Sequence, residues 1–103
     1  MKISLASPVY NESENIQEFI QRADNTLKEI SNDYEIILVN DASHDNTLSK
    51  IKDVLPKYKN LRLINLTENT GQHIASSIAL KNSTGDFIFL MDSDLQVNPE
   101  YMH

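Results

Sequence analysis

The sequence contains no cysteine, so it forms no disulfides and no thiolate metal sites, and a reducing cytoplasm is permitted. Positive charge is scarce, because 9 Lys and Arg stand against 15 Asp and Glu, for a net charge of −6. A protein that binds nucleic acid through the phosphate backbone needs clustered positive charge. We therefore expect no nucleic-acid partner, and any phosphate bound here needs the help of a cation or of backbone amides.

Long hydrophobic runs are also missing. No run approaches the ~18 apolar residues of a membrane span, and the first ten residues, MKISLASPVY, turn polar too soon for a secretory signal. We therefore expect a cytoplasmic protein. With 103 residues, 40% hydrophobic and 23% charged, the chain has the composition of a globular protein of one domain at most.

What the sequence does contain is an alternation of short apolar runs with longer amphipathic stretches, typical of strand–helix–strand units around a parallel sheet. The predicted fold class is α/β, with a Rossmann-like, doubly wound, mainly parallel sheet. We predict strands over residues 3–7, 34–39, 61–66 and 86–91. We predict one helix capped by Asn11 or Ser13 and running to Ile30, one with an apolar face from Leu48 to Tyr58 limited by Pro56, and one over residues 71–82.

Three further expectations follow from the residues of these elements. Pro8 lacks an N–H and is expected to end the ladder of the first strand. The runs 34–39 (YEIILV) and 86–91 (DFIFLM) are expected to be buried strands. In the last helix, Ile74, Ala75, Ile78 and Ala79 share one side, and the small alanines predict close packing on the sheet.

Polar side chains follow all four predicted strands. Since ligands of an open parallel sheet bind beyond the carboxyl ends of its strands, these residues are expected to meet in one crevice. The residues are Tyr10, Asn11 and Glu12 after the first strand, Asp41 and Ser43 after the second, Glu68 and Asn69 after the third, and Asp92, Asp94 and Gln96 after the fourth.

Asp92 and Asp94 carry the clearest chemistry of this set. Two carboxylates two residues apart, with the amide oxygen of Gln96 two residues further on, can face a hard cation such as Mg²⁺ or Mn²⁺ and leave room for phosphate oxygens. The alternative is a solvated acidic turn, and the position at the predicted crevice favours the metal. An EF-hand is excluded, because its sixth and twelfth positions would be Val97 and His103.

The other candidates have both functional and structural interpretations. Asp41 could accept hydrogen bonds from a base or a ribose, or it could cap a turn. Glu12 could line a site or sit in the first turn of a helix. Tyr10 could stack on a base or pack its own loop. His73 could meet phosphate at a helix N-terminus, whereas His44 is expected on the loop surface.

Taken in order, these segments resemble glycosyltransferase family 2, the inverting transferases with the GT-A fold. The matching segments are SPVYNE at 7–12, VNDASHDNT at 39–47 and MDSDLQ at 91–96. NTGQH at 69–73 and the pair Pro99 and Glu100 look most like the polyprenyl-phosphate branch, with its dolichol- and undecaprenyl-phosphate sugar transferases. Compared with the family pattern, Asn40 replaces an Asp, Ala42 replaces a Gly and Glu68 stands where a basic residue is common.

The resemblance implies that residues 1–103 form a single partial domain, the nucleotide-binding half of a GT-A fold. It implies transfer of a sugar from a nucleotide-diphosphate sugar, UDP-sugar favoured and GDP-sugar possible, to a lipid-phosphate or glycan acceptor. The nucleotide would contact Pro8, Tyr10, Glu12, Asp41 and Asp92, and a Mg²⁺ or Mn²⁺ ion would contact Asp92, Asp94 and Gln96.

In such enzymes the catalytic base and any membrane attachment at the cytoplasmic face lie in the part that follows, so no catalytic residue is assigned within this chain. The surface that the second half would cover is expected to be exposed and to favour self-association. Two alternatives stay open at this point. One is a non-catalytic doubly wound nucleotide-binding module, and the other is a haloacid-dehalogenase-like phosphatase, which also places Asp-x-Asp after an apolar strand.

Overall fold

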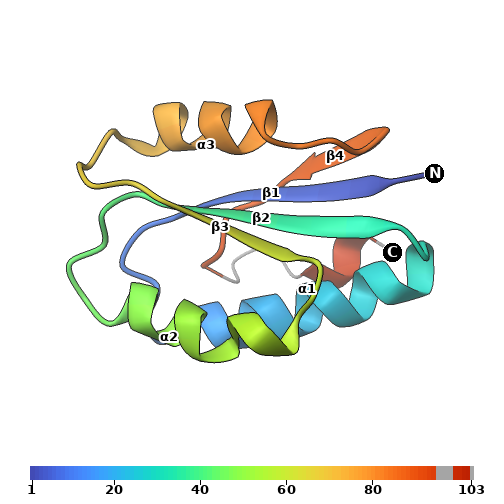
Figure 1. The fold of residues 1–103 in the computed structure, drawn as a ribbon, viewed down its shortest axis with the longest axis horizontal. Helices are drawn as coiled ribbons and strands as arrows, with labels where there is room; N and C mark the ends of the chain where they lie inside the picture. The colour runs from blue at the N-terminus through green and yellow to red at the C-terminus, as the bar shows by residue number, and fades with distance from the viewer. Residues whose placement is uncertain (95–98, 103) are drawn as a thin grey trace.

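In the computed structural model of the chain, which describes residues 1–94 and 99–102, four strands form one sheet (Figure 1). All three strand pairs are parallel, and the spatial order is β3-β2-β1-β4. The strands are β1 (Ile3–Val9), β2 (Tyr34–Asn40), β3 (Leu61–Asn65) and β4 (Phe87–Leu90). The predicted α/β class with a parallel sheet is confirmed.

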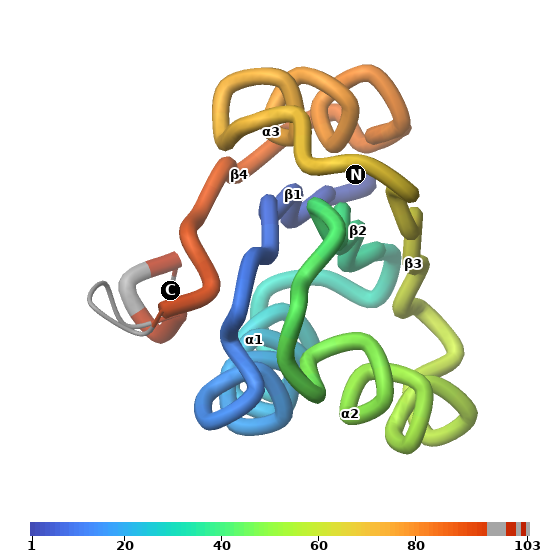
Figure 2. The backbone as a smooth tube through the Cα atoms, turned by 90° about the vertical axis from the view of Figure 1, so that its left-hand side faces the viewer, coloured from blue at the N-terminus to red at the C-terminus, as the bar shows by residue number. Residues whose placement is uncertain are grey.

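Helices cover both faces of this sheet. Figure 1 shows α1 and α2 below the sheet and α3 above it, so the molecule has three layers. The helices are α1 (Ile16–Ile30), α2 (Thr47–Val54) and α3 (Gln72–Lys81), with short 3₁₀ segments η1 (Leu55–Lys57) and η2 (Pro99–Met102). Figure 2 shows residues 99–102, which form η2, on the side of the sheet occupied by α1. There, Arg22 of α1 binds both carboxylate oxygens of Glu100.

The main hydrophobic core lies between the sheet and α1. Phe19 and Leu27 of α1 are fully buried against Leu5 of β1 and Ile36 of β2. All seven residues of β2 are buried, because β2 lies between two strands and beneath helices on both sides. The prediction of a central strand buried on both faces is therefore confirmed for residues 34–39.

On the other face, a second cluster of small side chains holds α3 against the sheet. Ala75 and Ala79 of α3 are fully buried against Ala6 and Val39. The predicted close packing through alanines is confirmed. The prediction for Ile74 is wrong, because this side chain is 54% exposed.

β4 is an exposed edge strand, contrary to the prediction of a buried run. Phe87, Ile88 and Leu90 are 57%, 42% and 51% exposed. β4 pairs only with β1 among the described strands, and α3 lies mainly over β1 and β2. An apolar strand is buried only when another element covers it, and this neighbour is not encoded in the strand's own composition.

Pro8 does not end the ladder of β1, which continues to Val9. Ala6 accepts a hydrogen bond from Met91 after β4, whereas Val9 accepts one from Asp41 after β2. Backbone groups alternate in direction along a strand, so the missing N–H of Pro8 faces the β4 side. Paired residues of β4 end at Leu90, opposite Ala6, so no ladder bond is lost.

The predicted caps of α1 are also wrong. The residue that precedes the helix is Asn15, and its side chain makes no capping hydrogen bond. Asn11 instead accepts a bond from the His44 amide, and the Ser13 amide donates to Asp45. Both residues therefore join the loops after β1 and β2. The helix after β2 is limited near Pro56 as predicted, because α2 ends at Val54 and continues as 3₁₀ turn η1.

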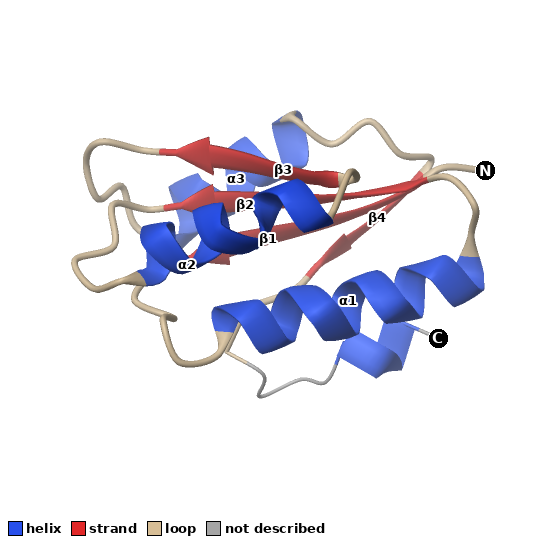
Figure 3. Ribbon diagram, turned by 60° about the horizontal axis from the view of Figure 1, so that its bottom comes forward, coloured by secondary structure: helices blue, strands red, loops and turns tan. Residues whose placement is uncertain are grey.

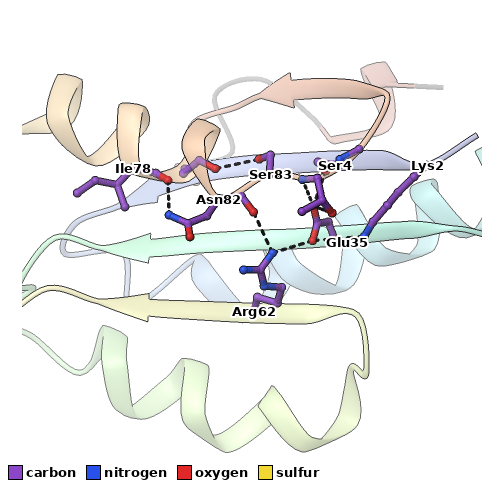
Figure 4. A network of polar contacts seen from close by, with 10 residues as sticks. Lys2, Ser4, Glu35, Arg62, Ile78, Asn82 and Ser83 are labelled. Carbon is purple, nitrogen blue, oxygen red and sulfur yellow. Dashed lines mark hydrogen bonds and ion pairs between the residues drawn. The ribbon is translucent and has the colours of Figure 1, made fainter.

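A polar network around Glu35 closes the amino-terminal end of the sheet (Figure 4). The buried carboxylate accepts hydrogen bonds from Ser4 of β1, Arg62 of β3 and both the amide and hydroxyl of Thr84. Arg62 also donates to the carbonyl of Asn82 just after α3. Burial works against the charged form, but these bonds outweigh it and lower the pKa of Glu35 to about 2. The ionised carboxylate of Glu35 on β2 therefore connects β2 to β1, to β3 and to the segment after α3.

Candidate functional site

A pocket opens at the carboxyl-terminal edge of the sheet, where the strand order reverses. The chain runs from β1 outward to β3 and then returns to place β4 on the other side of β1. Figure 3 shows the strands pointing the same way, with the loops that follow them gathered at one end. The pocket has a volume of about 360 Å³. It is lined by Pro8, Tyr10, Glu12, Asp41, Asn69, Gly71, Gln72, Ala75, Asp92, Ser93 and Asp94.

This pocket confirms the predicted crevice, because each of the four strands contributes at least one lining residue from its carboxyl end or the loop after it. Asn11, Ser43 and Glu68 follow the same strands without lining the pocket. Gln96, the third predicted metal ligand, lies outside the described residues. The structure thus brings most of the candidates together, while their individual roles stay predictions.

Asp92 and Asp94 line the pocket just after β4. Asp92 is exposed, and its Oδ1 accepts a hydrogen bond of 2.9 Å from Nε2 of Gln72, the first residue of α3. Between the two carboxylates, Ser93 is buried and its hydroxyl lies 3.4 Å from the Pro8 carbonyl oxygen. Ser93 therefore holds this turn against the end of β1 while its acidic neighbours line the pocket.

The pocket concentrates negative charge. Burial raises the pKa of Glu12, a hydrogen bond with Asn15 partly offsets this, and the charges of Asp94, Asp45 and Asp92 raise it further. Like charges this close repel one another, and a cation bound among them would remove the repulsion. The electrostatics thus favour a divalent ion, or a ligand that brings one, over a bare anion.

Asp41 is buried, and its carboxylate holds the turn that begins α3. Its Oδ1 accepts from the amide and hydroxyl of Thr70, at 2.7 and 2.9 Å, and its Oδ2 accepts from the Gly71 amide at 2.9 Å. Asp41 thus has a structural role, but its partners lie 29 and 30 residues away rather than in the local helix or turn that its position after β2 suggested. Because a carboxylate oxygen can accept two hydrogen bonds, Oδ2 still has capacity toward the pocket.

Three polar side chains and one backbone amide connect the loop after β2 to its neighbours. Buried Asn40 donates to Asn65 of β3 and accepts from the hydroxyl of Ser43. The same hydroxyl accepts from the backbone amide of Asn11 in the loop after β1.

Asn11 and Ala42 have positive φ values of 52° and 57°, a conformation that side chains make unfavourable. Ala42 stands at the position where the family pattern has glycine, and this backbone geometry explains that preference.

Tyr10 stands at the rim of the pocket, 43% exposed. The rings of Tyr10 and His44 form a T-shaped pair, with centroids 6.1 Å apart and an interplanar angle of 81°. His44 is exposed, as predicted, and it also contacts the Tyr10 ring, which could stack on a base. His73 is exposed and does not line the pocket, so the structure gives no support to its predicted contact with phosphate.

The oxygen donors in the pocket suit a hard divalent cation, provided that a bound diphosphate supplies further oxygen ligands. Within residues 1–94 and 99–102, no three or more His, Cys, Asp or Glu side chains are grouped to hold a metal ion. Mg²⁺ is commonly bound by one or two carboxylates together with substrate phosphates. Asp92 and Asp94 supply such a pair, so the described residues fit an ion that arrives with a diphosphate.

The sequence did not indicate Gln72, Gly71, Ala75 or Ser93 as site residues. All four line the pocket because α3 begins beside the end of β4. Gly71 is the residue before α3 and has φ of 90°. One available signal was this glycine, which favours the left-handed backbone needed where a loop turns into a helix.

Among the helices of the described residues, none has both the length and the hydropathy needed to cross a membrane.

Two solved structures with bound nucleotides resemble this chain. The mannosyltransferase PcManGT from Pyrobaculum calidifontis, in complex with GDP-Man and Mn²⁺, superposes with a TM-score of 0.79 at 26% identity, over 89% of this chain and 27% of that one. TarS 1-349 from S. aureus, in complex with UDP, gives a TM-score of 0.73 at 31% identity, over 91% and 28%. The four-stranded parallel sheet thus matches part of the GT-A fold.

Two curated relatives carry names from polyprenyl-phosphate chemistry. The chain is 39% identical over 100 residues to a dolichol-phosphate mannosyltransferase of Pyrococcus furiosus, covering 97% of this chain and 28% of that protein. It is 36% identical over 99 residues to an undecaprenyl-phosphate 4-deoxy-4-formamido-L-arabinose transferase of Pseudomonas fluorescens, covering 95% and 29%. The chain therefore spans less than a third of the length of these two relatives.

Residues 4–103 match the family described as glycosyl transferase family 2. Apart from Ile3, the first residue of β1, this range contains every strand and helix described above, together with the whole lining of the pocket. The chain therefore belongs to glycosyltransferase family 2.

Proposed function

We propose that this chain supplies the donor-binding part of an inverting glycosyltransferase and binds a nucleotide-diphosphate sugar in the pocket between the ends of β1 and β4. One observation carries the proposal: Asp92 and Asp94 line the same pocket as Tyr10 and Asp41, at the edge where open parallel sheets bind ligands. Membership of family 2 supports sugar transfer as the reaction of the whole enzyme.

The proposed roles follow from the positions of the side chains. Tyr10 would stack on the base, and Asp41 would accept a hydrogen bond from the nucleotide through its remaining Oδ2 lone pair. Pro8 and Glu12 would line the nucleotide. Asp92 would face the ribose and the diphosphate.

Asp92 and Asp94, together with Gln96 outside the described residues, would hold a Mg²⁺ or Mn²⁺ ion. A divalent ion bound there would neutralise the charge of the departing nucleoside diphosphate. The chain itself would hold the anomeric carbon so that an acceptor oxygen can displace the diphosphate in line, and a single displacement inverts the configuration. We assign no catalytic base to these residues.

The comparisons support this proposal and indicate which ligands to test. One similar structure holds GDP-Man with Mn²⁺ and another holds UDP, so both nucleotides are reasonable probes. The names of two relatives support a lipid-phosphate acceptor for the whole enzyme. A lipid acceptor would place the whole enzyme at a membrane surface, and we propose the cytoplasmic face. Membership of family 2 argues against the haloacid-dehalogenase alternative.

Calorimetric titration tests donor binding in this chain. We expect GDP or UDP to bind with a clear gain in affinity when Mn²⁺ is added. We expect Asp94→Asn to reduce that gain by at least about tenfold. Loss of a residue that only hydrogen-bonds to a metal ligand lowers metal affinity about 10- to 100-fold, and loss of a ligand itself should lower it at least as much.

The matched control is Asp53→Asn on α2, an exposed aspartate that does not line the pocket. It makes the same change of charge and should bind like the wild type. A folded wild-type chain that binds neither nucleotide, or an Asp94→Asn variant that keeps the full Mn²⁺ effect, would contradict the proposal. In that case the chain would be a doubly wound module without donor binding.

A further inference from the structure

We infer that Gln72 is a positioning residue for the metal-binding carboxylate, an inference that rests on the proposed function. Its Nε2 atom donates a 2.9 Å hydrogen bond to Oδ1 of Asp92, and both side chains line the pocket. The bond joins the first residue of α3 to the loop after β4, two segments 20 residues apart in sequence. Gln72 thereby orients Asp92 and leaves Oδ2 free of this bond and available to a cation or a ribose.

The backbone of Gln72 is held in place by Asp41. Gly71, immediately before it, donates its amide to Oδ2 of Asp41, and Thr70 donates both its amide and its hydroxyl to Oδ1. Asp41 is only 3% exposed at the end of the central strand β2. The buried carboxylate of Asp41 thus fixes the backbone at the start of α3. Gln72, the first residue of α3, in turn donates its side-chain hydrogen bond to the exposed carboxylate of Asp92.

A neutral amide suits this position better than a charged donor. A hydrogen bond to an ionised acceptor is stronger than one between neutral groups, so the amide can fix the orientation of the Asp92 carboxylate. Unlike a lysine or arginine, it adds no positive charge that would repel a divalent ion. Carboxylates that ligate metals commonly accept such supporting bonds, and loss of the supporting partner typically lowers metal affinity or activity about 10- to 100-fold.

Two variants and one control test this role by calorimetry with GDP and UDP, with and without Mn²⁺. Gln72→Met keeps the length of the side chain and removes the donor, and Gln72→Glu removes the donor and adds negative charge. Gln17→Met on α1 is the control, because it removes a comparable exposed amide, which binds the Lys50 carbonyl outside the pocket.

We expect Gln72→Met to lower the Mn²⁺-dependent gain in affinity about 10- to 100-fold. Nucleotide affinity without metal and the thermal midpoint should stay near the wild-type values, which separates positioning of Asp92 from a structural role. Gln72→Glu should lose the metal-free affinity as well, because its charge repels the diphosphate. Equal Mn²⁺ dependence in Gln72→Met, Gln17→Met and the wild type would overturn the inference.

A second measurement separates this inference from the proposed function. In the ligand-free protein, the side-chain amide signal of Gln72 in a ¹⁵N–¹H spectrum should shift in Asp92→Ala and stay in place in Asp53→Ala. An unmoved signal in Asp92→Ala would overturn the role of Gln72 even if nucleotide binds. A wild-type chain that binds no nucleotide while this signal shifts would overturn the proposed function and confirm only the contact.

Discussion

At the scale of single residues, this chain uses buried carboxylates as structural ties at both ends of its sheet. Asp41 holds the start of α3 beside the pocket, and Glu35 joins three strands and the end of α3 at the opposite end. Buried carboxylates are favourable only when hydrogen bonds replace the lost water, and both residues meet that condition. Asp92 differs from these two residues, because its carboxylate is exposed at the pocket.

Glu35 should make the stability of the protein depend on pH. Its folded pKa of about 2 lies below the ordinary 4.5, so its contribution is present above pH 4.5 and is lost as the pH falls toward 2. The difference corresponds to about 3 kcal/mol of unfolding free energy at neutral pH. We expect Glu35→Gln to be clearly destabilised at pH 7 in urea unfolding, and the gap from the wild type to shrink below pH 4.5.

The control for this measurement is Glu14→Gln, which makes the same change at an exposed residue of the loop after β1. It should follow the wild-type curve throughout. A gap between Glu35→Gln and the wild type that stays constant from pH 7 to pH 3 would show that ionisation of Glu35 is not the source of its contribution.

The hydrogen-bond partners of the carboxylates were harder to predict from the sequence than the residues of the candidate site. Tyr10, Glu12, Asp41, Asp92 and Asp94 could be placed at one edge because each follows a strand, and strand ends can be found from apolar runs. The partners of Glu35 and Asp92 depend on how separate segments pack together. Thr84 and Gln72 reach them across 49 and 20 residues, and no local pattern reports such a distance.

At the scale of elements, β2 and β4 show what a hydrophobic run does and does not predict. Both runs are strands in the parallel sheet, as expected. β2 is buried because elements cover it on every side, whereas β4 pairs on one edge and exposes Phe87, Ile88 and Leu90. A strand can therefore be predicted from its residues, but its burial depends on its neighbours in space.

The exposed apolar edge of β4 should make the chain associate with itself, because an uncovered edge strand can pair with another chain. We expect sedimentation velocity to show an average mass that rises with protein concentration. Ile88→Lys should reduce this association, because a charge on an edge strand opposes pairing. The control, Ser77→Lys, adds the same charge at an exposed position on α3 and should change it less.

A wild-type chain that sediments as a monomer at every concentration would contradict this expectation. Equal effects of Ile88→Lys and Ser77→Lys would assign the association to net charge rather than to β4.

At the scale of the whole molecule, the two ends of the sheet have different roles: one end is held by structural hydrogen bonds, and the other carries the proposed binding site. The amino-terminal end of the strands is closed by the Glu35 network, and the carboxyl-terminal end opens into the pocket. The net charge of −6 is consistent with this arrangement, since an acidic chain that binds a diphosphate needs a cation between the two. The reversal of strand order beside β1 places the pocket where all four loops can reach it.

The location of a bound Mn²⁺ ion tests this account most directly. With GDP or UDP present, paramagnetic broadening by Mn²⁺ can be mapped on the backbone amides of this 103-residue chain by NMR. We predict that the broadening is strongest at residues 92–94 and extends to 10–12 and 71–72, the segments that line the pocket. Broadening centred on α2, or near Arg22 and Glu100, would contradict the assignment of this pocket as the donor site.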